Sequence, residues 1–164
     1  MEERVHVSSW PIGRDFTFGE WCDYLKAHPN SASEPVADFD GWKFNVHGVC
    51  VNRATPVKMQ VGGASFDVQL YKAPRGRKLG EPLAWNFSVG YSDGIGGGSG
   101  GFDEVEGDDR DAIVAGLHKV IQRFEQSAEW NRRAGYDGRV AACQRAIEAA
   151  RQEIEKRQQL TLFD

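Results

Sequence analysis

The chain has 164 residues and a net charge of −4 at pH 7, with a pI near 5.6. Hydrophobic residues make up 40% of it and charged residues 27%, which is typical of a folded globular protein and excludes global disorder. The acidic balance argues against a protein whose main task is to wrap nucleic acid, because neutralising phosphates requires clustered lysines and arginines.

No apolar run approaches the roughly 20 residues that a membrane-spanning helix requires. The first residues, Met1-Glu2-Glu3-Arg4, lack the basic start and apolar stretch of a signal peptide. We therefore expect a cytoplasmic protein with no membrane partner. Cys22, Cys50 and Cys143 form no CxxC pair, so we expect reduced, buried thiols.

The first predicted element is a short helix that begins after Thr17. Thr17 and Glu20 have the spacing of a capping box, in which the hydroxyl and the carboxylate each accept a hydrogen bond from the backbone at the other residue. The aromatic residues that follow recur on one helical face. Pro29 is predicted to end the helix near His28.

The first strand is predicted over residues 42–46, where apolar and polar residues alternate. The preceding segment, residues 30–40, mixes Asn, Ser, Pro and Asp and is predicted to be a loop. Residues 49–51 are predicted to extend the strand or to form a bulge after Gly48.

The clearest strand prediction is a β-hairpin. Two alternating runs, residues 57–61 and 66–70, flank the two-residue turn Gly62-Gly63. A further alternating run over residues 83–91 follows the polar loop 72–80, so an antiparallel meander is expected.

A long helix is predicted over about residues 109–133. Asp108, Asp109 and Asp111 suit its N-cap and first turn, and apolar residues between 113 and 124 fall on one stripe.

A second helix is predicted over about residues 138–157, after a turn-prone segment at 135–138. Val140, Ile147 and Ile154 recur every seven residues, which gives this helix a narrow apolar seam on an otherwise polar surface.

Together these elements predict an α+β fold, with an antiparallel sheet of three to four strands over about residues 41–91, a short N-terminal helix and two C-terminal helices. We expect residues 1–155 to form a single domain and residues 156–164 to form a tail.

Gly96, Gly98 and Gly101 match the spacing of a dinucleotide-binding G-x-G-x-x-G loop. The acidic residues at 103–109 would repel a pyrophosphate, and no Gly-Lys-Ser/Thr follows. We therefore predict a flexible surface loop and no cofactor.

No metal-ligating or catalytic residues are assigned. His47 and Cys50 point to opposite faces of a strand at this spacing, and no second pair completes a tetrahedral set. An enzyme acting on nucleic acid remains an alternative, but it would need a carboxylate or histidine cluster in a pocket.

Basic residues gather in two segments, residues 72–78 and the set Arg132, Arg133, Arg139 and Arg145. A solvated surface is the simpler interpretation, and a weak nucleic-acid contact is the alternative.

The end of the chain carries the most specific motif. Gln159, Leu160, Leu162 and Phe163 match the consensus Gln-Leu-x-Leu-Phe, with Thr161 at the variable position. This tail resembles the peptide through which bacterial proteins dock on the replicative sliding clamp. Polymerases, mismatch-repair proteins and phage- or plasmid-borne proteins carry similar tails. A resemblance over five residues implies a partner and not an activity.

In this recognition mode an extended peptide offers Gln159 for hydrogen bonds and its apolar side chains for adjacent pockets, with Leu162 and Phe163 as anchors. The alternative is that Leu160, Leu162 and Phe163 fold back and complete the core.

The aromatic run 83–91 and the helix start at residues 109–112 also resemble, more loosely, small proteins of mobile elements. The function expected is therefore that of a non-enzymatic accessory protein recruited to the bacterial DNA polymerase sliding clamp, with the folded domain binding a second, unidentified protein. The alternative is a phage- or plasmid-encoded inhibitor of a host defence or nucleic-acid enzyme, acting by protein–protein binding.

Overall fold

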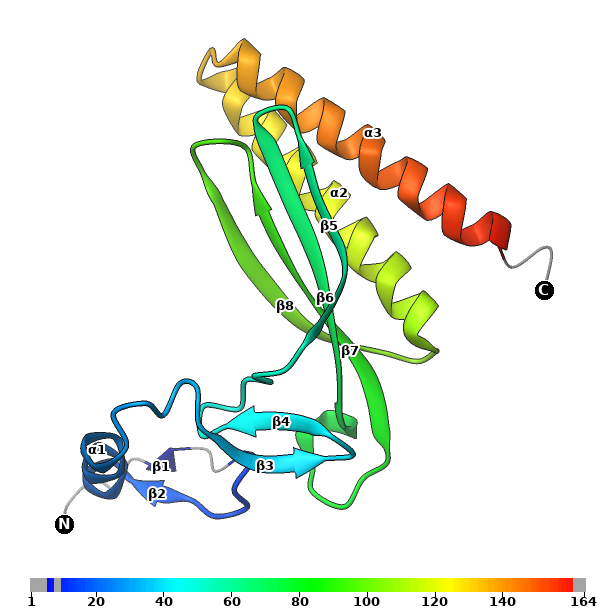
Figure 1. Ribbon diagram of the computed structural model, residues 1–164. Helices are drawn as coiled ribbons and strands as arrows, with labels where there is room; N and C mark the ends of the chain where they lie inside the picture. The colour runs from blue at the N-terminus through cyan, green and yellow to red at the C-terminus, as the bar shows by residue number, and fades with distance from the viewer. Residues whose placement is uncertain (1–5, 8–9, 161–164) are drawn as a thin grey trace. The chain divides into compact units, whose positions relative to one another are not determined.

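The computed structural model describes residues 6–7 and 10–160, and these residues form an α+β protein (Figure 1). They comprise three α-helices and eight strands arranged in three antiparallel sheets, more strands than the three or four that the sequence predicted. The chain divides into two compact units. Unit 1 is Met1–Arg53 with Tyr71–Ala84, and unit 2 is Ala54–Leu70 with Trp85–Asp164.

Unit 1 contains short elements. They are β1 (His6–Val7), β2 (Phe16–Thr17), α1 (Phe18–Ala27), β3 (Pro35–Phe39), β4 (Trp42–Asn45) and the 3₁₀ turn η1 (Arg75–Arg77). The predicted first helix is confirmed, and so is its capping box: Glu20 N donates to Thr17 Oγ1 at 3.3 Å, and Thr17 N donates to Glu20 Oε2 at 2.8 Å.

The prediction of a loop over residues 30–40 is wrong in its second half, because β3 pairs with β4 there. The turn between them is Asp40-Gly41, and both residues have positive φ, which is the backbone of a type I′ hairpin. The strand is mostly exposed, so it lacks the alternation by which a half-buried strand is identified in a sequence.

The core of unit 1 is small and aromatic. Phe44, Cys50 and Tyr71 are buried in it, and Trp10 and Phe39 pack against them. Burial raises the pKa of the Tyr71 hydroxyl to about 12.

Unit 2 is built on a four-stranded sheet in the order β5–β6–β7–β8 (Figure 1). The strands are β5 (Ala54–Val61), β6 (Ala64–Pro74), β7 (Leu83–Ser92) and β8 (Gly97–Val105), and the outer ends of β6 and β7 continue into unit 1. The predicted hairpin is confirmed, because Val61 pairs with Ala64 across Gly62-Gly63.

The prediction of a flexible loop at Gly96, Gly98 and Gly101 is wrong for Gly98 and Gly101, which lie in β8, whereas Gly96 belongs to the turn before that strand. Ser92 pairs with Gly97 and Tyr91 pairs with Gly98. A Cβ built on Gly97 would collide with the Tyr91 carbonyl oxygen, so the strands approach each other as only glycine permits.

Two long helices, α2 (Asp109–Arg133) and α3 (Asp137–Leu160), run side by side over one face of this sheet (Figure 1). The N-cap of α2 is Asp108, and its capping box with Asp111 confirms the predicted helix start.

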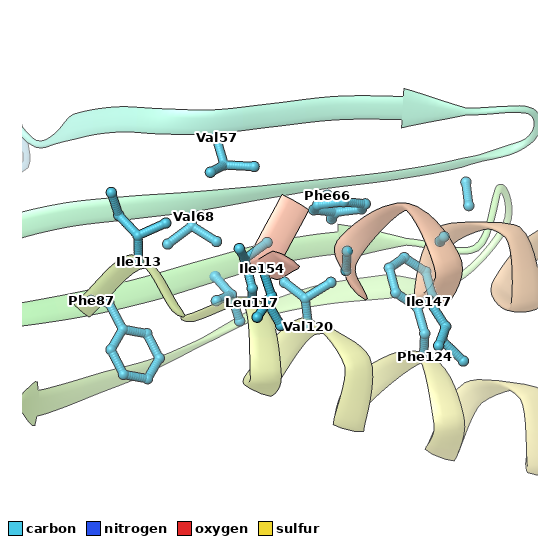
Figure 2. Packing of buried hydrophobic residues seen from close by; sticks show 14 of the residues in the cluster. Val57, Phe66, Val68, Phe87, Ile113, Leu117, Val120, Phe124, Ile147 and Ile154 are labelled. Atoms are coloured by element: carbon cyan, nitrogen blue, oxygen red, sulfur yellow. The ribbon is translucent and has the colours of Figure 1, made fainter. Parts of the chain in front are cut away.

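The core of unit 2 lies between the sheet and these helices (Figure 2). Leu117, Val120 and Phe124 of α2 are fully buried against Val68 and Phe66 of β6. Ile147 and Ile154 of α3 complete the cluster, which confirms these two residues of the predicted seam, whereas Val140 is only partly buried and lies outside the cluster. No helix among the described residues is long and apolar enough to span a membrane.

Candidate functional site

The predicted clamp-binding residues lie at the end of α3 or beyond it. Gln159 and Leu160 form the last turn of the helix, which extends past its predicted end at residue 157. Leu160 is 58% exposed. Thr161, Leu162 and Phe163 lie outside the described residues.

The apolar seam of α3 stops before the motif begins. Ile154 is its last buried residue, and the six residues from 155 to 160 include none that is buried. Arg157 and Glu153 form an ion pair of 3.0 Å between partly exposed side chains. Leu160 is therefore not folded back onto the core, so the alternative interpretation is wrong for this residue.

A second candidate lies at the other end of the helix pair, where the turn between β7 and β8 meets α2. Asp93 begins this turn, and the residue is only 7% exposed. Its Oδ1 accepts hydrogen bonds from Ile95 N at 3.2 Å and Gly96 N at 2.8 Å. Its Oδ2 accepts from Ser127 Oγ at 2.7 Å and Asn131 Nδ2 at 2.9 Å. One carboxylate thus fixes the turn and ties it to α2.

These hydrogen bonds also set the ionisation of Asp93. Burial by itself raises the pKa of the carboxyl, but the donors from Asn131, Gly96, Ser127 and Ile95 outweigh it and lower the pKa to about 2. A carboxylate with four donors and so low a pKa is a poor general base, so its role here is structural.

Around this anchored turn the surface is apolar and aromatic. Three of the eight large apolar side chains that are exposed in the described chain lie here: Ile95 at 74%, Trp130 at 61% and Tyr136 at 47%. Trp130 and Tyr136 have ring centroids 6.3 Å apart. The guanidinium carbon of Arg139 lies 4.4 Å from the Tyr136 centroid.

An open pocket of about 410 Å³ lies among these side chains. Its lining includes Tyr91, Ile95, Arg123, Gln126, Trp130 and Arg139. We call this pocket and its rim, including Tyr136, the Trp130 surface.

The two arginines of the pocket differ from their neighbours. Arg132 and Arg133 both pair with Glu129, at 2.8 and 2.9 Å. Within residues 10–160, Arg123 and Arg139 make no ion pair with a carboxylate. Their charges are therefore available to a ligand.

The open face of the sheet carries a second pocket, of about 480 Å³. Lys58, Gln60 and Asp67 line it, and Gly90 leaves room for the Asp67 side chain, which a Cβ at that position would displace. Asp67 accepts a hydrogen bond from Gln69 at 2.8 Å. Met59, Phe66 and Tyr91 also line the pocket, but all three pack against the core of unit 2.

The other residues considered from the sequence are dispersed. His47 is exposed while Cys50 is buried, and no group of three metal-ligating side chains exists among the described residues. Arg77 of the basic loop is not simply solvated, because it donates to Gly48 O at 2.9 Å and to Tyr71 Oη at 3.0 Å. Of the cysteines, Cys50 and Cys143 are buried and Cys22 is half-buried.

The sequence interpretation missed the Trp130 surface, although two signals for it exist. Asp93-Gly94 is a hairpin-turn dipeptide directly after a predicted strand. Trp130 lies off the stripe that runs from Ile113 to Phe124, so the pattern of α2 already places a large aromatic residue outside the core. Comparison of the chain with protein-family models, curated proteins and solved structures gives no match.

Proposed function

We propose that this chain is a cytoplasmic, non-enzymatic accessory protein recruited to the bacterial DNA polymerase sliding clamp through residues Gln159–Phe163. The observation that carries the proposal is the exposure of Gln159 and Leu160 at the end of a helix whose buried seam has already stopped at Ile154. Because these two side chains have no role in the core, they are accessible to a partner.

Docking in an extended form requires the last turn of α3 to open, since Gln159 and Leu160 are helical in the free chain. Helix ends fray at small cost, because the terminal carbonyls have no intrahelical partner and no core contact holds this turn. Gln159 then provides hydrogen bonds, and Leu160, Leu162 and Phe163 provide apolar contacts.

The test is a calorimetric titration of the full chain into purified bacterial clamp. We expect a dissociation constant of about 1–100 μM, the range that a few anchors in a groove provide. The double substitution Leu162→Ala with Phe163→Ala should weaken binding at least about a hundredfold, because both anchors are lost.

The matched control is Lys156→Ala, which changes an exposed residue of the same helix outside the motif. It should leave the affinity within about twofold. Absence of binding by the unaltered chain, or equal binding by the double variant, would refute the proposal.

A second candidate function is inhibition of a host defence or nucleic-acid enzyme by a phage- or plasmid-encoded protein. The Trp130 surface favours it, since tryptophan, tyrosine and arginine are the residues most enriched at binding hot spots. This function predicts that substitutions at Trp130, and not at Phe163, abolish the biological effect.

A further inference from the structure

We propose that the Trp130 surface binds an acidic peptide segment of a partner protein, in which carboxylates flank an aromatic or large aliphatic side chain. This inference does not depend on clamp binding, because it concerns different residues at the opposite end of the α2–α3 pair. It assigns a chemistry to the partner that the folded part of the chain recognises.

The shape of the surface argues for a side chain as the central contact. Trp130 and Ile95 are large, apolar and mostly exposed, and both line the pocket of about 410 Å³. A cavity of this size accepts one large side chain and part of its backbone. Exposed apolar clusters of this kind are typical of protein interfaces.

The charges argue for carboxylates beside that side chain. Arg123 and Arg139 line the same pocket, and neither pairs with a carboxylate of the described chain. The only carboxylate in the lining, Asp93, is buried and already accepts four hydrogen bonds. A guanidinium binds a carboxylate through two parallel hydrogen bonds, which fix the orientation of the contact and also strengthen it.

Contacts within the chain also hold parts of this surface before binding. The Asp93 network holds the turn that carries Ile95, and the Tyr136 ring contacts the Trp130 ring and the Arg139 guanidinium. Side chains that are already ordered lose little conformational entropy on binding, so a short peptide gains measurable affinity.

Nucleic acid fits less well. Trp130 could stack on a base, but it also lines a second hollow with Glu125 and Glu129. A phosphate backbone extends beyond one pocket and would pass these carboxylates, and tracking it requires a row of cations and not two. A short peptide can instead be confined to the pocket that Arg123 and Arg139 line.

The experiment is selection of displayed random octapeptides on the full chain, followed by titration of the most enriched peptide in fluorescently labelled form. We expect enriched peptides to carry two or more aspartates or glutamates next to an aromatic or large aliphatic residue. Affinity should fall as salt is added, because both arginine contacts are near the surface.

Variants then locate the site. Trp130→Ala should weaken binding more than about tenfold, and Arg123→Gln and Arg139→Gln about three- to tenfold each. Arg145→Gln, an exposed arginine of α3 outside the pocket, is the matched control and should change it less than about twofold. Melting curves of each variant show whether it is folded, and Arg139→Lys, which keeps the charge, should bind with intermediate strength.

Three results would overturn the inference: no enrichment, enrichment of neutral or basic peptides, or binding that the Trp130 and arginine substitutions leave unchanged. Displacement of the peptide by a single-stranded oligonucleotide that binds more tightly would identify nucleic acid as the ligand instead. The double substitution at Leu162 and Phe163 should not affect peptide binding, so failure here and failure of clamp recruitment are distinguishable.

Discussion

The two ends of the α2–α3 pair present apolar side chains to solvent in different ways. At one end, the buried Asp93 carboxylate orders the turn that carries Ile95 beside Trp130. At the other end, Gln159 and Leu160 form a last helical turn with no buried residue. The first end is held by hydrogen bonds made on folding, and the last turn of α3 makes no contact with the core. Substitutions at the first end should therefore change the free energy of unfolding, and substitutions at the second end should not.

The largest expected difference in stability is between the same substitution, phenylalanine to alanine, at two positions. Phe124→Ala removes a fully buried ring and should lower the free energy of unfolding by about 3–5 kcal/mol. This corresponds to a fall in melting temperature of about 6–20 °C. Phe163→Ala should leave the melting temperature within about 1 °C, because a docking residue contributes nothing to the free chain. A large fall for Phe163→Ala in a thermal scan would show that the ring belongs to the core and that the clamp motif is coincidental.

Asp93→Asn tests the ordered end. The substitution removes the negative charge that accepts hydrogen bonds from Ser127 and Asn131. The new side-chain NH2 group must also face donors, because both oxygens of Asp93 accept hydrogen bonds. We expect a loss of about 2 kcal/mol in the free energy of unfolding, which follows from the lowered pKa, and a fall in melting temperature of about 4–8 °C. Clamp affinity measured by calorimetry should not change. If it fell as well, the two ends would be energetically coupled.

Lowering the pH should weaken the Asp93 hydrogen bonds at the same end of the α2–α3 pair. The pKa of Asp93 is lower in the folded chain, at about 2, than its ordinary value of 3.8. Its contribution is therefore complete above about pH 5 and is lost as the pH falls through 4 toward 2. Denaturant titrations over this range should show about 2 kcal/mol more loss for the unaltered chain than for Asp93→Asn. Equal losses would mean that Asp93 titrates normally.

The smallest effect concerns the opening of α3. Gln158→Gly lowers the helix propensity of the turn before the motif by about 0.8–1 kcal/mol. If the last turn must open for docking, the clamp affinity should rise by about two- to fourfold. Gln158→Ala, which preserves helix, should leave the affinity nearly unchanged. Weaker clamp binding by the glycine variant would indicate that the motif docks as a helix.

Local sequence patterns were sufficient for several elements. The capping box at Thr17, the N-cap at Asp108 and the Gly62-Gly63 hairpin are formed by residues close together in the chain, and the structure confirms each of them. The stripe of α2 is also confirmed, because burial against a sheet imposes the helical period on apolar residues. The five-residue resemblance at the end of the chain was likewise readable, and it stays a prediction.

Only the tertiary structure decided the elements whose own residues show no clear pattern. The segment that forms β8 is rich in glycine and has little strand propensity, and pairing with β7 makes it a strand. The Asp93 carboxylate meets Ser127 and Asn131 across 34 and 38 residues, and no periodicity encodes such a contact. The sequence by itself determined the capped helices, the hairpin and the apolar stripe, because near neighbours specify them. The tertiary structure decided β3 and β8, because pairing with β4 and β7 orders segments whose own residues do not alternate. It decided the Trp130 surface, because residues far apart in the sequence meet there.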